Sequence, residues 1–109
     1  MNKFTELTVM PDFCCSGIWT NNINSTVEFE DLCLPDELIK EFEEWINFYD
    51  YKCHEHDCFT FTDDQNEIKK LNDKGKELAK KLKMLFSDIQ IFYKGETSDK
   101  MLDKEEITL

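Results

Sequence analysis

The chain has 109 residues, of which 40% are hydrophobic and 13% aromatic, and its formal net charge is −11 at pH 7. This length is typical of a single domain whose hydrophobic core is large enough to be stable without disulfides or a bound metal. The aromatic content argues against intrinsic disorder. The charge comes from 24 acidic against 13 basic residues, and every basic residue is a lysine. An acidic chain without arginine repels phosphates, which excludes nucleic acids and anionic membranes as direct partners.

The chain shows no targeting or spanning segment by composition. The first thirteen residues lack the apolar stretch of a secretion signal, and the apolar runs are too short to cross a bilayer. We therefore expect a cytoplasmic protein whose five cysteines are free thiols.

Three segments near the N-terminus have strand character. Phe4–Met10 is the first, Cys14–Thr20 is the second and bends near Gly17, and Thr26–Phe29 alternates polar and apolar residues. We predict that these segments form a small antiparallel meander.

A helix is predicted at about residues 35–50. Pro35 suits the first helical position, because its missing N–H would have no partner there. The apolar side chains recur at helical spacing and form one stripe: Leu38, Ile39, Phe42, Trp45, Ile46 and Tyr49. Glu37, Glu41 and Glu44 share another face, which we expect to be exposed.

Tyr51–Phe61 is predicted to be a loop or a short extended segment, and a second helix is predicted at about 63–86. Thr62 and Gln65 fit a capping box at its start, and Gly75 weakens its middle, where a break or kink is allowed. Its outer face carries seven lysines, which we expect to pair with the acidic helix of the same or a neighbouring molecule: Lys69, Lys70, Lys74, Lys76, Lys80, Lys81 and Lys83.

A last strand is predicted at Ile89–Tyr93, and residues 96–109 are predicted to be a loosely attached polar tail. The sum is a single α+β domain over residues 1–95. It has two layers, with a small antiparallel sheet of three or four strands packed against two helices.

One cluster has the residue types of a metal site: Cys53, His54, His56 and Cys58. Zinc binds thiolates and imidazoles, but six consecutive residues rarely wrap four ligands around one ion. We therefore expect no metal, no cofactor and no enzyme, and a small zinc- or thiol-dependent enzyme remains as a further alternative. Stoichiometric metal in protein purified without chelator would support this alternative, and its absence would remove it.

The strongest functional signal is acid density. Nine acids lie between Glu28 and Asp50 against the single base Lys40. Such crowding costs self-repulsion and attracts basic protein surfaces, so we interpret it as a docking surface. The candidate partner-binding residues add acids from the following segments and two aromatic anchors: Trp19, Glu28, Glu30, Asp31, Glu37, Glu41, Glu44, Asp50, Tyr51, Glu55, Asp57, Asp63 and Asp64.

Four segments together resemble small bacterial immunity proteins of contact-dependent growth inhibition and other polymorphic toxin systems. They are Ser16–Trp19, Leu32–Leu38, Lys74–Ala79 and Phe86–Ile89. The resemblance implies an acidic, cytosolic, non-enzymatic protein that binds the C-terminal domain of a cognate toxin and blocks its active site. Such toxins are often nucleases with basic clefts.

We therefore predict an immunity protein that occupies the basic cleft of a toxin, a ribonuclease being our first choice. Long-range attraction should speed the association, and added salt should slow it. The alternative is an acidic DNA mimic or adaptor that inhibits a nucleic-acid-binding enzyme. The oligomeric state is not determined by these residues, and we expect a monomer.

Overall fold

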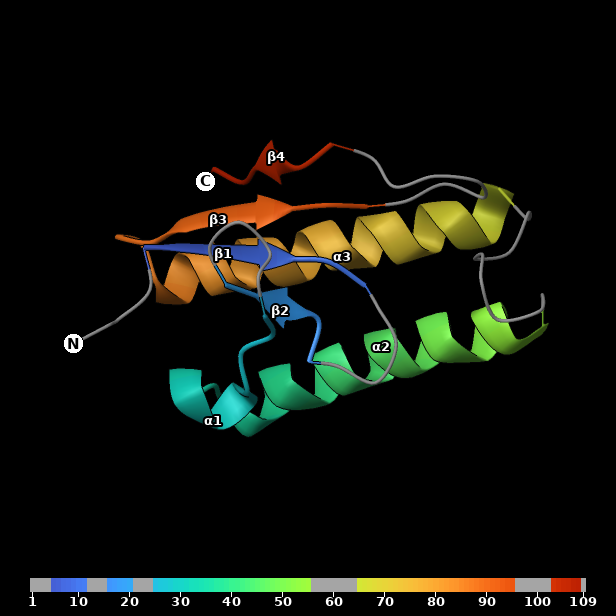
Figure 1. Cartoon of the computed structure of the whole chain (residues 1–109), viewed down its shortest axis with the longest axis horizontal. Coiled ribbons are helices and arrows are strands. Elements are labelled where there is room, and N and C mark those ends of the chain that lie inside the picture. The colour runs from blue at the N-terminus through green and yellow to red at the C-terminus, as the bar shows by residue number, and fades with distance from the viewer. Residues whose placement is uncertain (1–4, 12–15, 21–24, 56–64, 96–102, 109) are drawn as a thin grey trace.

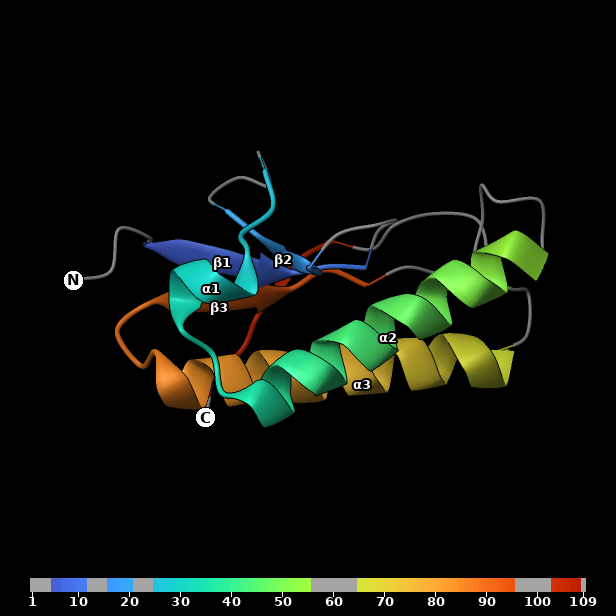
Figure 2. The ribbon, with the colours of Figure 1, turned by 90° about the horizontal axis from the view of Figure 1, so that it is seen from below.

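The computed structural model describes residues 5–11, 16–20, 25–55, 65–95 and 103–108, and the side chains of 52–55 are not described. A sheet forms one layer, and two long helices form the other (Figures 1 and 2). The predicted two-layer α+β class is therefore confirmed. In chain order the elements are β1 (Glu6–Val9), β2 (Ile18–Trp19), α1 (Phe29–Leu32), α2 (Asp36–Glu55), α3 (Gln65–Leu85), β3 (Gln90–Tyr93) and β4 (Glu105–Glu106).

The sheet has the strand order β2-β1-β3-β4 and is mixed. β1 pairs in parallel with β3, with Leu7 opposite Ile91 and Val9 opposite Tyr93. The antiparallel pairs are β1 with β2 and β3 with β4. The sequence predicted an antiparallel sheet. The central pair differs because the chain between β1 and β3 passes through both long helices, and a crossover of this kind returns the next strand in the same direction.

Two of the three predicted N-terminal strands are present, and the prediction of the third was wrong. β1 and β2 lie inside Phe4–Met10 and Cys14–Thr20. In the predicted strand Thr26–Phe29, Thr26 makes only an isolated bridge to Trp19, and Phe29 begins α1. The ring of Phe29 packs 5.9 Å from that of Phe42, and this contact with α2 outweighs the local strand pattern.

The two long helices form where the sequence predicted them, but their first and last residues differ from the predicted ones. α2 continues to Glu55, so the N-terminal part of the predicted loop Tyr51–Phe61 is helical. No glycine or proline lies between residues 50 and 55 to stop it. α3 runs without interruption through Gly75, where a kink had been allowed. Within the described helices, none is long and apolar enough to cross a membrane.

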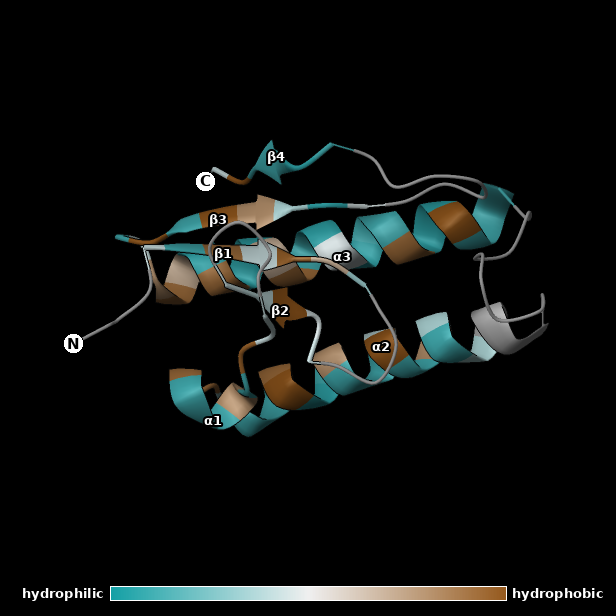
Figure 3. Cartoon of the chain, viewed as in Figure 1, coloured by the Kyte–Doolittle hydropathy of each residue, from teal (hydrophilic) through white to brown (hydrophobic). Residues whose placement is uncertain are grey.

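The core lies between the sheet and the helices. Leu7, Val9 and Ile91 point toward the helices and are fully buried. Because side chains alternate along a strand, Thr8, Trp19 and Phe92 share the opposite face of the sheet. In Figure 3, β2 and β3 are largely hydrophobic, whereas β4 is hydrophilic.

Trp45 joins α2, α3 and the sheet. Its indole N–H donates a 2.9 Å hydrogen bond to the carbonyl oxygen of Leu71 in α3. Its ring centroid lies 6.3 Å from that of Tyr93 in β3. Gly75 gives both rings the room to approach the backbone of α3, because a Cβ there would lie 2.7 Å from Cζ2 of Trp45. This contact, and not a kink, explains a glycine in mid-helix.

The C-terminal segment is held more firmly than a loose tail from residue 96 onward would be. β4 pairs with β3, and Ile107 is buried and donates a 2.8 Å backbone hydrogen bond to Ile91. Lys104 forms a 2.7 Å ion pair with Glu6 and lies 4.3 Å above the ring of Phe92. The sequence did not predict β4, because the few apolar residues of this polar segment are isolated from one another and form no strand pattern.

The substitution Gly75→Ala is expected to destabilise the fold by about 1–3 kcal/mol. The added methyl group would overlap the rings of Trp45 and Tyr93, and neither ring has room to move away. The ring of Tyr93 is fixed by a 2.8 Å hydrogen bond from its hydroxyl to Asn72. Helix propensity alone would give the opposite sign, about 1 kcal/mol of stabilisation. Urea unfolding measures the difference. Lys80→Ala on the exposed face of the same helix is the control, and an unchanged or more stable Gly75→Ala protein would contradict this packing.

Candidate partner-binding surface

The acids of α1 and α2 are largely uncompensated. Seven of the nine acids between Glu28 and Asp50 form no ion pair with any residue in the described ranges: Glu28, Glu30, Asp31, Asp36, Glu37, Glu43 and Glu44. All of these side chains are exposed. The apolar stripe of α2 faces the core, so the helix turns its charged faces outward on a fixed backbone.

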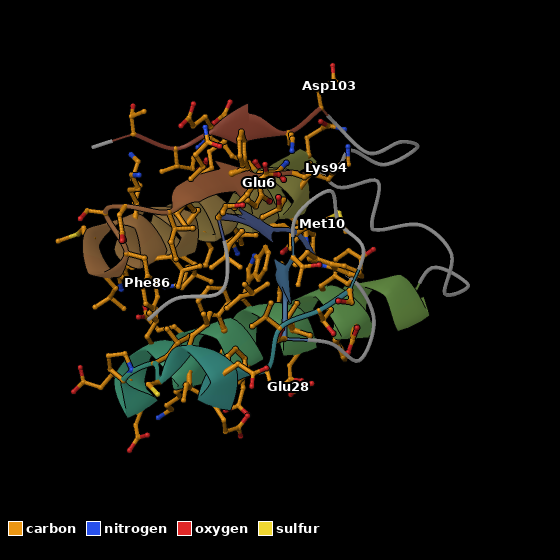
Figure 4. The ribbon with its side chains drawn as sticks, turned by 60° about the vertical axis from the view of Figure 1, so that its left-hand side comes forward. Glu6, Met10, Glu28, Phe86, Lys94 and Asp103 are labelled. Atoms are coloured by element: carbon orange, nitrogen blue, oxygen red, sulfur yellow. The ribbon has the colours of Figure 1, made fainter. Side chains whose placement is uncertain are left out.

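A hollow of about 650 Å³ lies between α2 and the segments that precede it. Figure 4 shows Glu28 beside the helical layer, on the opposite side of the molecule from Asp103. Four carboxylates face one lysine around the hollow, so its net charge is negative. The lining residues are Ser16, Thr26, Glu28, Phe29, Lys40, Glu43, Glu44, Ile46, Asn47 and Asp50.

A buried serine, Ser16, lines this hollow and connects two of the segments that precede α2. The hydroxyl of Ser16 donates a 2.6 Å hydrogen bond to the carbonyl oxygen of Val27 and accepts one of 3.2 Å from the N–H of Ile18. Gly17 adopts a left-handed φ of 83°, and a Cβ there would lie 3.0 Å from the ring of Trp45. The segment before α1 is thereby pressed against α2, and Glu28 is placed opposite the acids of that helix.

Glu41 has a different role from the other acids. It accepts hydrogen bonds of 2.8 Å from Lys74 and 2.7 Å from Lys81, both in α3. Glu77 lies 3.4 Å from Lys74 and 3.7 Å from Lys81. These two lysines and two glutamates form a network with no net charge, which we call the clasp. It confirms the predicted pairing of the lysine face with the acidic helix in the same molecule.

The clasp shifts the pKa values of Glu41 and Lys74. Hydrogen bonds from Lys74 and Lys81 lower the pKa of Glu41 below its ordinary value of 4.5. The hydrogen bond that Lys74 donates to Glu41 in turn raises the pKa of Lys74 above 10.5. Both shifts favour the charged forms of Glu41 and Lys74.

Other lysines of α3 also form ion pairs or hydrogen bonds within the chain. Lys69 pairs with Asp73, Lys70 lies 3.9 Å from Glu67, and Lys76 lies 3.3 Å from Glu105. The ammonium group of Lys83 donates to the carbonyl oxygens of Ser87 and Ile89. The positive face of α3 is therefore largely compensated, and the surplus of negative charge remains on α1 and α2.

The structure separates the residues that the sequence proposed for binding. Glu28, Glu44 and Asp50 line the hollow, whereas Glu37 and Glu41 lie nearer α3. Glu30 and Asp31 are exposed on α1.

The two aromatic candidates lie apart from each other. Tyr51 follows Asp50 on α2 and is 62% exposed. Trp19 is half-buried on the open face of the sheet, and its indole N–H donates a 3.1 Å hydrogen bond to Met10.

Several sequence candidates fall outside the described part of the chain. Glu55 ends α2, but its side chain is not described, and Asp57, Asp63 and Asp64 lie outside the described residues. The same holds for His56 and Cys58 and for the side chains of Cys53 and His54.

The sequence reasoning missed the hollow itself. Lys40, Glu43, Asn47 and Asp50 recur at three, four and three residues, which is the spacing of one helical face. That second polar stripe was the available signal. The partner across the hollow could not be found in the same way, because Glu28 and Ser16 reach it only through the tertiary fold.

These observations define a small α+β binding protein whose outward acids are held on a rigid helix. Residues 5–96 match the model of the family described as Serratia CdiI immunity protein-like, and the chain belongs to this family. It is therefore an immunity protein of contact-dependent growth inhibition, a class of inhibitor that neutralises a cognate toxin. Searches of curated proteins and of solved structures each gave no match.

The substitution Glu41→Gln is expected to lower the free energy of unfolding at pH 7 by about 1 kcal/mol, since the pairs it breaks are partly exposed. The depressed pKa of Glu41 means that the folded state binds fewer protons than the unfolded state just below pH 4.5. The stabilisation is present above that value and is lost as the pH falls through the folded pKa.

Chemical unfolding at pH 7 and pH 3 measures this effect. The difference between the native and Glu41→Gln proteins should shrink at pH 3, and Glu43→Gln, which breaks no ion pair in the described structure, is the matched control. An equal difference at both pH values would show that charge pairing is not its cause.

Proposed function

We propose that this immunity protein neutralises a ribonuclease toxin by seating its acidic hollow on the basic active-site cleft. The observation that supports this is the distribution of charge. Glu28, Glu43 and Glu44 line one concave surface and form no ion pair in the described structure, whereas six of the seven lysines of α3 have partners within the chain. These three glutamates are free to meet a cationic partner. The protein then acts as a stoichiometric inhibitor and not as an enzyme.

Nucleic-acid cleavage is the toxin activity that best suits such a surface. A protein that binds RNA neutralises its phosphates with lysine and arginine, so its cleft is positive. Glu28, Glu43, Glu44 and Asp50 would replace phosphates as partners of those side chains. We place this encounter in the cytoplasm of the protected cell, where a ribonuclease finds its substrate.

The hollow form of the surface favours a toxin over the alternative of a DNA mimic. Phosphates on a duplex form raised rows, whereas these carboxylates line a depression that accepts protruding basic side chains. Tyr51, which is exposed beside Asp50, is our candidate for an aromatic anchor at its edge. Trp19 lies on the open face of the sheet and is not part of this proposal.

RNA and the immunity protein should compete for the toxin. The test uses the C-terminal domain of the cognate toxin, with cleavage of a fluorescent RNA as readout. One equivalent of this protein should abolish cleavage, and an uncleavable RNA analogue should weaken its binding in proportion to analogue concentration.

Co-expression of the same domain in cells should give growth only when this chain is present. Inhibition that RNA cannot compete away would contradict occupation of the cleft. A toxin domain that cleaves no RNA would contradict the choice of a ribonuclease.

A further inference from the structure

The seam between α2 and α3 carries two apolar depressions on the surface that faces away from the sheet. The first, of about 300 Å³, is lined by Pro35, Leu38, Met84 and Leu85, with Glu37, Glu41 and Lys81 at its rim. The second, of about 310 Å³, is lined by Trp45 and Phe48, with Glu41, Glu44, Lys70 and Lys74 around it. Figure 2 shows the two helices side by side along this seam.

The exposed apolar side chains of the described structure concentrate here. Met84 is 70% exposed and Leu85 48%, and Tyr51 is the other large hydrophobic residue exposed to this degree. Adjacent exposed apolar side chains at the end of a helix, next to a depression that they line, are typical of a surface that a partner covers.

The clasp divides the seam and sets its charge. Glu41 lines both depressions, and its network with Lys74, Lys81 and Glu77 has no net charge. The flank on α2 is negative, because Glu37 and Glu44 border the depressions and form no ion pair in the described structure. The seam is thus a neutral, partly apolar track with one acidic border.

The spacing of the two depressions fits a helical partner. Leu38 and Trp45 mark them and lie seven residues apart on α2, which is about 10 Å along a helix axis. Apolar side chains at positions i and i+7 of another helix have the same separation, so one helix laid along the seam reaches both depressions.

We propose that the seam binds an amphipathic helix of the toxin, with two apolar anchors seven residues apart and basic residues on the flank beside Glu37 and Glu44. The identity of the partner rests on the function proposed above. A second copy of this chain is the poorer occupant, because its net charge of −11 opposes self-association along an acidic border. The seam thus adds a second contact beside the acidic hollow, and Glu44 lines both.

The test measures the affinity of the same toxin domain by calorimetry. The double substitution Met84→Ser with Leu85→Ser should weaken binding by about 10- to 100-fold, since exposed apolar anchors carry much of the affinity of an interface. Gln90→Ser, an exposed position on β3, is the control and should leave the affinity within about twofold. Circular dichroism and thermal unfolding establish that each variant is folded.

Hydrogen exchange on the toxin domain identifies the occupant. The proposal expects new protection over a helical segment of at least two turns, and this protection should be lost with the double variant. Protection confined to loops would overturn it. So would a dimer of the free immunity protein that the double variant dissolves.

The outcomes separate this inference from the proposed function. If the native protein inhibits cleavage and the double variant binds equally well, the seam proposal fails and the function stands. If the double variant binds weakly while RNA does not compete, the seam proposal stands and occupation of the cleft fails. If the native protein does not bind the toxin, both fail.

Discussion

The packing of Trp45 is the contact on which the rest of the structure depends. Its indole reaches the carbonyl of Leu71, the ring of Tyr93 and the space left by Gly75, so a single side chain fixes α2 to α3 and to the sheet. Gly17 meets the same ring from the segment before α1. Because α2 cannot rotate without breaking these contacts, the direction of every acid on its outer faces is set. The acidic surface is a consequence of this core.

Charge is divided unequally over this scaffold. Six of the seven lysines of α3 have partners within the chain, above all in the clasp around Glu41, whereas the acids of α1 and α2 mostly have none in the described structure. Uncompensated carboxylates repel one another and reduce stability, and we propose that a cationic partner offsets this cost. Membership of the immunity family supplies the class of that partner, a toxin. The hollow and the seam are the two surfaces through which we propose that it binds.

The sequence predicted the elements with strong periodicity and failed where tertiary contacts decide. Leu38, Phe42, Trp45 and Tyr49 identified the first long helix, and the segment Ile89–Tyr93 identified β3. The direction of β3 and the short helix at Phe29 depend on contacts between segments far apart in the chain, which no local pattern contains. The same limit applied to the site: the acids of α2 were recognised, but the hollow required the position of the segments before α2, and the role of Glu41 required the position of α3.

The central claim is that the carboxylates around the hollow draw the toxin to this face. The most direct measurement is the association rate with the toxin domain, for Glu43→Gln with Glu44→Gln against a matched pair, Asp103→Asn with Glu106→Gln. Both pairs remove two exposed charges, but only the first lies at the hollow. The first pair should slow association about tenfold at low salt and less at high salt, and the second should change it little. Equal association rates for the two pairs would contradict the claim.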